Sequence, residues 1–209
     1  MNEIEFHGPL MVVRFPTPQV CVSWAIVNGG RVVAPAVAWY FIEPHEQPEL
    51  VEPSEFLGSK LDAAGLAEAV GLITSRKRYG QVVQTAQHGN FRACCVATTG
   101  LSNALRIGDA PTYVPMGTIN LLCQVSVPLS EECALEAIAM AAEARTTAVM
   151  DTSAPATGTG TDCIVIAYPL GGATAKYAGK HTQLGHVIGK AVFDAVHQGI
   201  KEWQSEHRP

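Results

Sequence analysis

The stretch from Gln183 to Gln204, QLGHVIGKAVFDAVHQGIKEWQ, contains the clearest structural signal in this 209-residue chain. Its apolar side chains recur three or four residues apart, which is the spacing of one face of an α-helix. These side chains are Leu184, Val187, Ile188, Ala191, Val192, Ala195, Val196, Ile200 and Trp203. Gly185 and Gly189 lie four residues apart, so they would allow another segment to approach this helix closely. The stretch predicts a long helix that covers a core.

Other segments show helical spacing to different degrees. Residues 130–150 begin with Ser130, a good N-cap, and Glu131 and Glu132 follow where the helix dipole favours negative charge. The apolar face expected for this second helix consists of Leu135, Ile138, Ala142, Thr146 and Val149. Residues 61–73 also have helical spacing, although two glycines weaken it.

The remaining apolar runs have the lengths and turn signals of β-strands. Asn28-Gly29-Gly30 and His88-Gly89-Asn90 each separate two such runs, which predicts two hairpins. Pro35 argues against a central position for the strand that contains it. The expected strands are 10–15, 20–27, 31–42, 80–86, 91–99, 119–127 and 162–169, and the last two lack alternation, as strands buried on both faces do. Residues 43–53 are expected to form an exposed loop.

This order of elements favours the α+β class. Antiparallel pairing comes early, and the long helices come late, between and after the last strands. We expect a layered architecture with a mixed or mostly antiparallel sheet covered by long helices. No repeat or long linker divides the chain, so residues 1–209 are expected to form a single domain. With 47% hydrophobic residues, the chain can cover both faces of a sheet.

Charge and cysteine content exclude several classes of function. The net charge is −5 and the largest basic cluster is Arg76-Lys77-Arg78, which is too small to hold a nucleic acid backbone. Every apolar run is interrupted before 18 residues and no signal-peptide pattern occurs, so neither a membrane span nor secretion is expected. The six cysteines lack zinc-type or CxxC spacing, which predicts reduced thiols and a cytoplasmic protein.

Residues 154–162, Ala-Pro-Ala-Thr-Gly-Thr-Gly-Thr-Asp, form the first segment suited to chemistry. Its glycines allow backbone N–H groups to turn inward, its threonines supply hydroxyls, and Asp162 supplies a carboxylate. Such a loop could stabilise an oxyanion and position a water molecule. An ordinary flexible turn explains the same composition equally well.

Three further segments contain polar residues in suggestive positions. Lys180 and His181 precede the last helix, where the dipole opposes positive charge and favours the neutral, basic form of a histidine; a lone histidine more often has a surface or packing role. Residues 98–104 and 117–120 each place an asparagine beside small hydroxylated residues, which suits either a turn cap or the binding of ligand amides. Glu143 lies at the margin of its helix's apolar face, either in solvent or facing a cleft.

Seven segments, in their order along the chain, resemble the adenosylcobinamide amidohydrolase family. They are residues 28–30 (NGG), 70–74 (VGLIT), 99–104 (TGLSNA), 117–120 (GTIN), 143–145 (EAR), 157–162 (TGTGTD) and 177–182 (YAGKHT) with Leu184-Gly185. Arg145 stands where the family commonly has lysine, and Ile73 and Ser75 stand where methionine and alanine are more usual. An arginine cannot serve as a proton-transferring amine, which counts against Arg145 as a catalytic base.

The resemblance implies hydrolysis of the amide that joins aminopropanol to the corrin ring in adenosylcobinamide, giving adenosylcobyric acid for cobamide salvage. His181 or Asp162 would act as the base, the loop of Thr159 to Thr161 would contact the oxyanion, and Lys180 or Glu143 would stabilise charge or transfer a proton. The expected catalytic residues are Asp162, His181, Thr161, Glu143 and Lys180. The expected substrate-binding residues are Asn103, Ser102, Thr99, Asn120, Thr118, Thr159, Gly160 and Tyr177.

This scheme has few requirements for other molecules. It requires no cofactor, although Asp162, Glu143 and His181 could converge on a divalent metal ion. The expected partner is a small corrinoid, and a homodimer is the default expectation. Two alternatives stay open: a corrinoid carrier or sensor without catalysis, and a hydrolase that acts on another amide.

Overall fold

A mixed sheet organises the computed structural model, which describes residues 3–43, 46, 52–110, 117–152, 156–172 and 174–207. The sheet has eight strands in the order β4-β3-β2-β10-β8-β6-β5, with β1 beside β2. Its strands are β1 (Glu3–His7), β2 (Leu10–Ser23), β3 (Gly30–Phe41), β4 (Val70–Thr74), β5 (Gln81–His88), β6 (Phe91–Thr99), β8 (Ile119–Val125) and β10 (Cys163–Tyr168). A separate two-stranded sheet pairs β7 (Ala104–Leu105) with β9 (Gly158–Thr159). The helices are α1 (Pro53–Ala63), α2 (Glu131–Asp151) and α3 (Gln183–Glu206).

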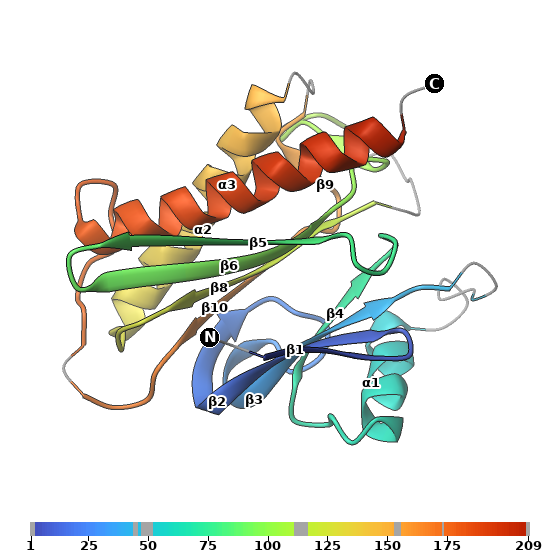
Figure 1. Cartoon of the computed structure of the whole chain (residues 1–209), viewed down its shortest axis with the longest axis horizontal. Helices are drawn as coiled ribbons and strands as arrows, with labels where there is room; N and C mark the ends of the chain where they lie inside the picture. Colours follow the sequence, from blue (N-terminus) through green and yellow to red (C-terminus); the bar gives the residue numbers. More distant parts are fainter. Residues whose placement is uncertain are drawn as a thin grey trace.

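The elements stack in layers (Figure 1). Helices α2 and α3 cover one face of strands β5, β6, β8 and β10, and strands β1 to β4 curl beneath the opposite face. Helix α1 packs on the outer side of β2 and β3 through Leu57 and Leu61. This arrangement confirms the predicted α+β class with a mixed sheet covered by long helices.

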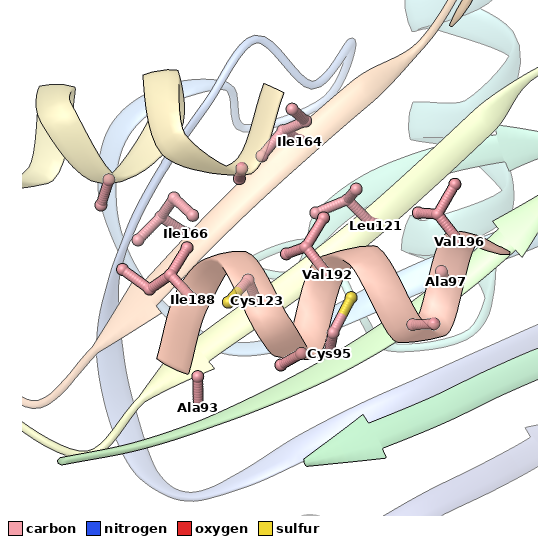
Figure 2. Packing of buried hydrophobic residues seen from close by; sticks show 14 of the residues in the cluster. Ala93, Cys95, Ala97, Leu121, Cys123, Ile164, Ile166, Ile188, Val192 and Val196 are labelled. Carbon is pink, nitrogen blue, oxygen red and sulfur yellow. The ribbon is translucent and has the colours of Figure 1, made fainter. Parts of the chain in front are cut away.

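The largest core lies between α3 and the sheet (Figure 2). Ile188, Val192 and Val196 of α3 face side chains of β6, β8 and β10, and all three are fully buried. Burying one such side chain contributes about 1.5–3 kcal/mol to folding. The helix predicted from Gln183 is confirmed, and its predicted apolar face is buried except at Trp203, which is partly exposed.

Strand β10 is buried on both faces, as its lack of alternation predicts. Ile164 and Ile166 belong to the core under α2 and α3, whereas Val165 and Ala167 belong to a second core beneath the sheet. The two neighbours of β10 are β2, which is antiparallel to it, and β8, which is parallel to it. One late strand therefore joins the two halves of the sheet.

Both predicted hairpins form. Strand β2 pairs with β3 and strand β5 pairs with β6, each antiparallel. The expected strands 10–15 and 20–27 are, however, one strand that ends at Ser23 and contains an irregularity between Arg14 and Gln19. Pro35 lies opposite this irregularity, so its missing N–H breaks no ladder bond and β3 can have neighbours on both sides.

The helix predicted over residues 61–73 is wrong. Helix α1 begins at Pro53 and ends at Ala63, and Gly65 follows with a positive φ of 71°. Val70–Thr74 forms β4, which pairs with β3 in parallel. The early helix start also shortens the expected loop 43–53, of which residues 44, 45 and 47–51 lie outside the described residues.

Helix α2 is confirmed, including its cap, since the Ser130 hydroxyl accepts the N–H of Cys133 at 3.2 Å. Its predicted apolar face is only partly correct, because Leu135 is 65% exposed. The helix instead buries a face of small residues: Cys133, Ala134, Ala137, Ala141, Ala148 and Val149. Small side chains allow α2 to lie close to the sheet and to α3.

Gly185 is tightly enclosed at the start of α3. A Cβ at this position would overlap the backbone carbonyl oxygens of Gly179 and Ala178, which cannot move aside freely. We expect Gly185→Ala to lower the free energy of unfolding by about 1–3 kcal/mol, as overpacked sites do. Urea denaturation of the variant measures this loss.

Gly189 provides the matched control one turn later in the same helix. A Cβ there meets only the Met140 methyl group, at 3.8 Å. We expect Gly189→Ala to be neutral or to stabilise by up to about 1 kcal/mol through helix propensity. Equal effects of the two substitutions would contradict the close approach at Gly185.

Candidate functional site

Buried polar side chains gather at one end of the sheet, where β4 and β6 end and β8 and β10 begin. Among the described residues, nine polar or charged residues are buried, and seven of them lie here. The seven are Thr74, Arg76, Thr98, Thr99, Asn103, Thr118 and Asn120. Burial of polar groups is costly unless they are paired, so such a concentration marks a candidate functional site.

Asp162 lies at the centre of this end, directly before β10, and its side chain is 6% exposed. Its Oδ1 accepts the backbone N–H of Ile119 at 2.9 Å and the hydroxyl of Thr159. Its Oδ2 accepts the backbone N–H of Thr159 at 3.0 Å and forms an ion pair with Arg145. One carboxylate thus links the loop 157–162 to β8 and to α2.

Arg145 is the positive partner in this arrangement. Its side chain is 15% exposed, and burial lowers the pKa of its guanidinium, although arginine stays charged at any ordinary pH. A Cβ at Gly158 would lie 2.5 Å from Oδ2 of Asp162 and 2.6 Å from Nη1 of Arg145. Gly158 is therefore required, because any side chain at this position would overlap the atoms of the Arg145–Asp162 ion pair.

Asn103 and Ser102 lie beside the loop because β7 pairs with β9. The backbone N–H of Gly160 donates to the carbonyl of Asn103 at 3.3 Å, and the Asn103 amide lies against Gly160. Ser102, Gly160 and Thr161 are exposed, whereas Asn103 is 9% exposed. The structure therefore brings four predicted site residues to one rim that a substrate can reach.

Thr118 and Asn120 hold this end of the sheet together. The Thr118 hydroxyl lies 2.9 Å from the Thr161 carbonyl and 3.2 Å from Oδ1 of Asn120. The Asn120 amide donates to the carbonyl of Ile73 at 2.5 Å, which ties β8 to the end of β4. These contacts favour a scaffold role for both residues over direct binding of a ligand.

Thr99 and Arg76 lie where the last turns of α3 meet the sheet. Thr99 is fully buried, with its side chain against Gly199, so it lies beneath the surface of the site. Arg76 is 6% exposed and pairs with Glu206 through two contacts of 2.9 and 3.2 Å. Hydrogen bonding to Arg76 lowers the pKa of the Glu206 carboxyl.

The other predicted residues, Tyr177, Lys180, His181 and Glu143, lie apart from Asp162. Lys180 forms an exposed ion pair with Glu143 at 2.5 Å. Glu143 and Arg145 are two positions apart on α2, about 200° around the helix, so Glu143 points away from Asp162. No contact among the described residues joins His181 to the loop 157–162, so the structure separates the predicted catalytic residues into two groups.

Local structure explains much of the segment 177–182. The Thr182 hydroxyl caps α3 by accepting the N–H of Gly185 at 2.9 Å, and the N–H of Ala178 donates to Glu136 at 2.6 Å. Fourteen positions, about 21 Å of helix, separate Gly185 from Gly199 near Thr99. Helix capping and close packing therefore account for Thr182 and Gly185 without a catalytic role.

Two chemical alternatives receive no support from the described residues. Cys163 adjoins Asp162, but burial raises the pKa of its thiol to about 12, so it is a poor nucleophile at neutral pH. No group of three or more histidine, cysteine, aspartate or glutamate side chains in the described ranges could hold a metal ion. The described residues therefore do not show the convergence of Asp162, Glu143 and His181 that the sequence left possible.

One surface pocket of about 410 Å³ lies away from this site. It is formed by β2, β3 and the turn before β4, and no predicted site residue lines it. Its lining residues are Pro18, Asn28, Val32, Val33, Pro35, Ala67 and Glu68. We place the candidate site at the polar end of the sheet because the buried polar side chains gather there.

Sequence reasoning missed Trp24 and gave Arg145 no role. The indole Nε1 of Trp24 donates to the carbonyl of Asp162 at 2.7 Å, and the side chain is 48% exposed. No spacing rule connects residues so distant along the chain. A signal did exist for Arg145, because it lies in one of the seven family-like segments and the second helix brings it over the sheet.

Comparison with known proteins identifies relatives over nearly the whole chain. The family model described as adenosylcobinamide amidohydrolase matches residues 1–208. A Halobacterium salinarum protein named adenosylcobinamide amidohydrolase is 31% identical over 96% of this chain and 87% of its own length. A Methanosarcina mazei protein of the same name is 29% identical over 71% of this chain and 75% of its own length.

A solved structure with some similarity is the PH0078 protein from Pyrococcus horikoshii OT3. Its sequence identity is 9% and its TM-score is 0.48. The match covers 98% of this chain and 83% of that one. In the described part of the present chain, no helix is both long enough and apolar enough to cross a membrane.

The buried ion pair makes Asp162 sensitive to substitution. Asp162→Asn would leave Arg145 without its charged partner and weaken the bonds to Thr159 and Ile119. We expect a loss of about 3–5 kcal/mol in the free energy of unfolding, as for other broken buried pairs. Urea denaturation measures the loss. A loss below about 0.5 kcal/mol, the size typical of a surface substitution, would contradict the linking role.

The Arg76–Glu206 pair should make stability depend on pH. Because Arg76 lowers the pKa of Glu206, the pair stabilises the fold above the ordinary carboxyl value of 4.5 and loses this effect as pH falls through the lowered value. We expect Glu206→Gln to destabilise by up to about 1 kcal/mol at pH 7 and by less below pH 4 (about the pKa of an unperturbed carboxyl). Thermal denaturation at both pH values, with Asp194→Asn in an exposed pair as control, checks this.

Proposed function

The chain belongs to the adenosylcobinamide amidohydrolase family, and on this premise we propose that it hydrolyses the amide between the corrin side chain and aminopropanol in adenosylcobinamide. The products would be adenosylcobyric acid and aminopropanol. The physiological role would be salvage of corrinoids for cobamide synthesis. The free cysteines, which include the cross-strand neighbours Cys95 and Cys123, support a reducing, cytoplasmic location.

One observation supports the location of the reaction: family-like segments that are far apart in the sequence meet at the polar end of the sheet. Each is joined to a neighbour by a contact already described, such as Asn120 to Ile73 and Asp162 to Arg145. The segments are 70–74, 99–104, 117–120, 143–145 through Arg145, and 157–162. Packing alone does not require buried polar residues at such a junction.

Asp162 is better suited to acting on the Thr159 hydroxyl, to which it is already bonded, than to taking a proton directly from water or substrate. Each of its oxygens already accepts two donors, so a substrate or water proton would have to displace one of them. The Thr159 hydroxyl donates to Oδ1, and a carboxylate partner draws proton density from such a hydroxyl. We assign the activation of the attacking oxygen to the Thr159–Asp162 pair: as Thr159 Oγ attacks the amide carbonyl, its proton passes along the existing hydrogen bond to Oδ1 of Asp162 and from there to the departing amine of aminopropanol. Water then hydrolyses the resulting ester and regenerates the Thr159 hydroxyl.

The exposed rim supplies groups for the substrate amide. Ser102 carries an exposed hydroxyl and Asn103 an amide beside Gly160, whereas the Thr161 hydroxyl donates to the Gly117 carbonyl at 3.3 Å and can offer the substrate an acceptor. Hydrogen-bond donors fixed near the reacting carbonyl stabilise the negative charge of the tetrahedral intermediate.

The first test is incubation of the metal-stripped protein with adenosylcobinamide, followed by mass spectrometry for adenosylcobyric acid. We expect product from the wild type and a loss of about 100-fold or more in rate for Thr159→Ala, in the range of general acid–base contributions. Thr159→Ser keeps the hydroxyl and should retain most activity. Thr147→Ala, an exposed threonine on α2, is the matched control.

Further variants locate the reaction. An Asp162→Ala protein that circular dichroism shows to be folded should form no product if the loop is the site, and His181→Ala should then retain activity. Loss of product in a folded His181→Ala protein, with normal activity in both Thr159 variants, would move the site to the start of α3. Activity that returns only with added divalent ions would show that the protein needs a metal.

The alternative functions give different results in the same assay. A corrinoid carrier or sensor would bind cobinamide tightly and release no product, with binding unaffected in His181→Ala and in folded Asp162→Ala. A hydrolase of another amide would cleave small amides while failing to bind cobinamide. The net charge of −5 is compatible with a cationic corrinoid, and the oligomeric state stays a prediction to be checked by light scattering.

A further inference from the structure

Trp24 is an exposed aromatic residue fixed at the candidate site. It lies one position past the end of β2, and its side chain is 48% exposed. Its Nε1 donates to the carbonyl of Asp162 at 2.7 Å, and its backbone forms a hydrogen bond with the thiol of Cys163. Both contacts attach Trp24 to the chain segment that leads from the loop 157–162 into β10.

The alternation of β2 indicates the direction of the indole. Val20 packs in the core under α2 and α3, whereas Cys21 packs in the core on the opposite face. Continuing this alternation places Trp24 on the helix side of the sheet, where Arg145 descends from α2 to Asp162. The exposed indole therefore lies on the same side as the groups assigned to the reaction.

The polar part of this side chain is already occupied. An indole has one hydrogen-bond donor, and here it is used internally, so the exposed remainder offers only an apolar aromatic surface. Isolated exposed aromatic residues are common, but this one is held by a side-chain bond to the residue at the centre of the site. The arrangement suits stacking on a flat group of a bound molecule.

Resting on the proposed function, we propose that Trp24 stacks on the adenine of the adenosyl group and is a specificity-determining residue for adenosylated corrinoids. Adenine has two flat faces without substituents. The corrin ring, in contrast, has axial ligands on its faces and side chains around its rim. Stacking of a base on an aromatic side chain changes affinity by about tenfold or more when the side chain is truncated to alanine.

The test compares two substrates that differ only in the axial ligand, adenosylcobinamide and cyanocobinamide. We expect Trp24→Ala to raise KM by about tenfold or more for the adenosylated substrate, with kcat and the cyanocobinamide KM little changed. Trp24→Phe keeps an aromatic face and should retain most of the affinity. Ile26→Ala, which alters a nearby residue that is 44% exposed, should affect both substrates equally.

A purely structural role for Trp24 gives a different pattern. Phenylalanine and alanine both remove the bond from Nε1 to Asp162, so a tethering role predicts equal losses for the two variants and for the two substrates. That result would overturn the proposal. Thermal denaturation of each variant confirms that the fold is intact before the kinetics are compared.

A binding experiment separates this proposal from the proposed reaction. Titration with 5′-deoxyadenosine should quench tryptophan fluorescence in the wild type and not in Trp24→Phe, because Trp39 is fully buried and Trp203 partly buried. If the wild type hydrolyses neither corrinoid, the proposed function fails while this titration still decides the role of Trp24. Equal quenching in both proteins, or none in the wild type, would overturn the stacking role.

Discussion

The carboxylate of Asp162 is the contact on which the site depends. It accepts hydrogen bonds from the loop 157–162 and from β8, and it forms an ion pair with α2. A single side chain thus holds these three elements together. A buried charge without partners is very costly, whereas a fully bonded one fixes the geometry of everything around it. The glycine at position 158 and the arginine at position 145 are consequences of this requirement, because each leaves space for the pair or completes it.

Close packing is the second constraint, and small residues satisfy it. Helix α2 buries a row of alanines, and α3 places Gly199 directly against Thr99 at the polar end of the sheet. The helices can therefore approach the strands closely enough for Arg145 and Glu206 to reach partners near the sheet. Packing and polar chemistry are coupled here, since a bulkier helix face would lift both charged side chains away.

Several parts of the fold could be predicted because local chemistry determined them. The caps at Ser130 and Thr182, the two hairpin turns and the apolar face of α3 follow from short-range rules. The helix expected over 61–73 failed because Val70–Thr74 pairs with a strand more than 30 positions earlier, and tertiary pairing of this kind overrides local helical spacing. The face of α2 was misjudged because alanine carries little hydrophobic signal.

The site was predictable in composition but not in arrangement. Asp162, Asn103 and Thr161 were selected from single short segments, and the register of β7 with β9 brings them together. Lys180 and His181 were selected by the same reasoning, yet the length of α3 places them far from the loop. Trp24 could not be selected, because only the pairing of β2 with β10 brings it beside Asp162.

The central position of β10 also has a consequence for folding kinetics. This strand comes late in the chain but pairs with β2 near its beginning and with β8, so the middle of the sheet cannot close until distant segments meet. The chain loses the conformational entropy of the long intervening loops before the contacts between these strands can stabilise the sheet. Until then, the apolar edges of β2 and β8 are open to other chains, and the protein is expected to fold slowly and to depend on dilution or chaperones while it does so.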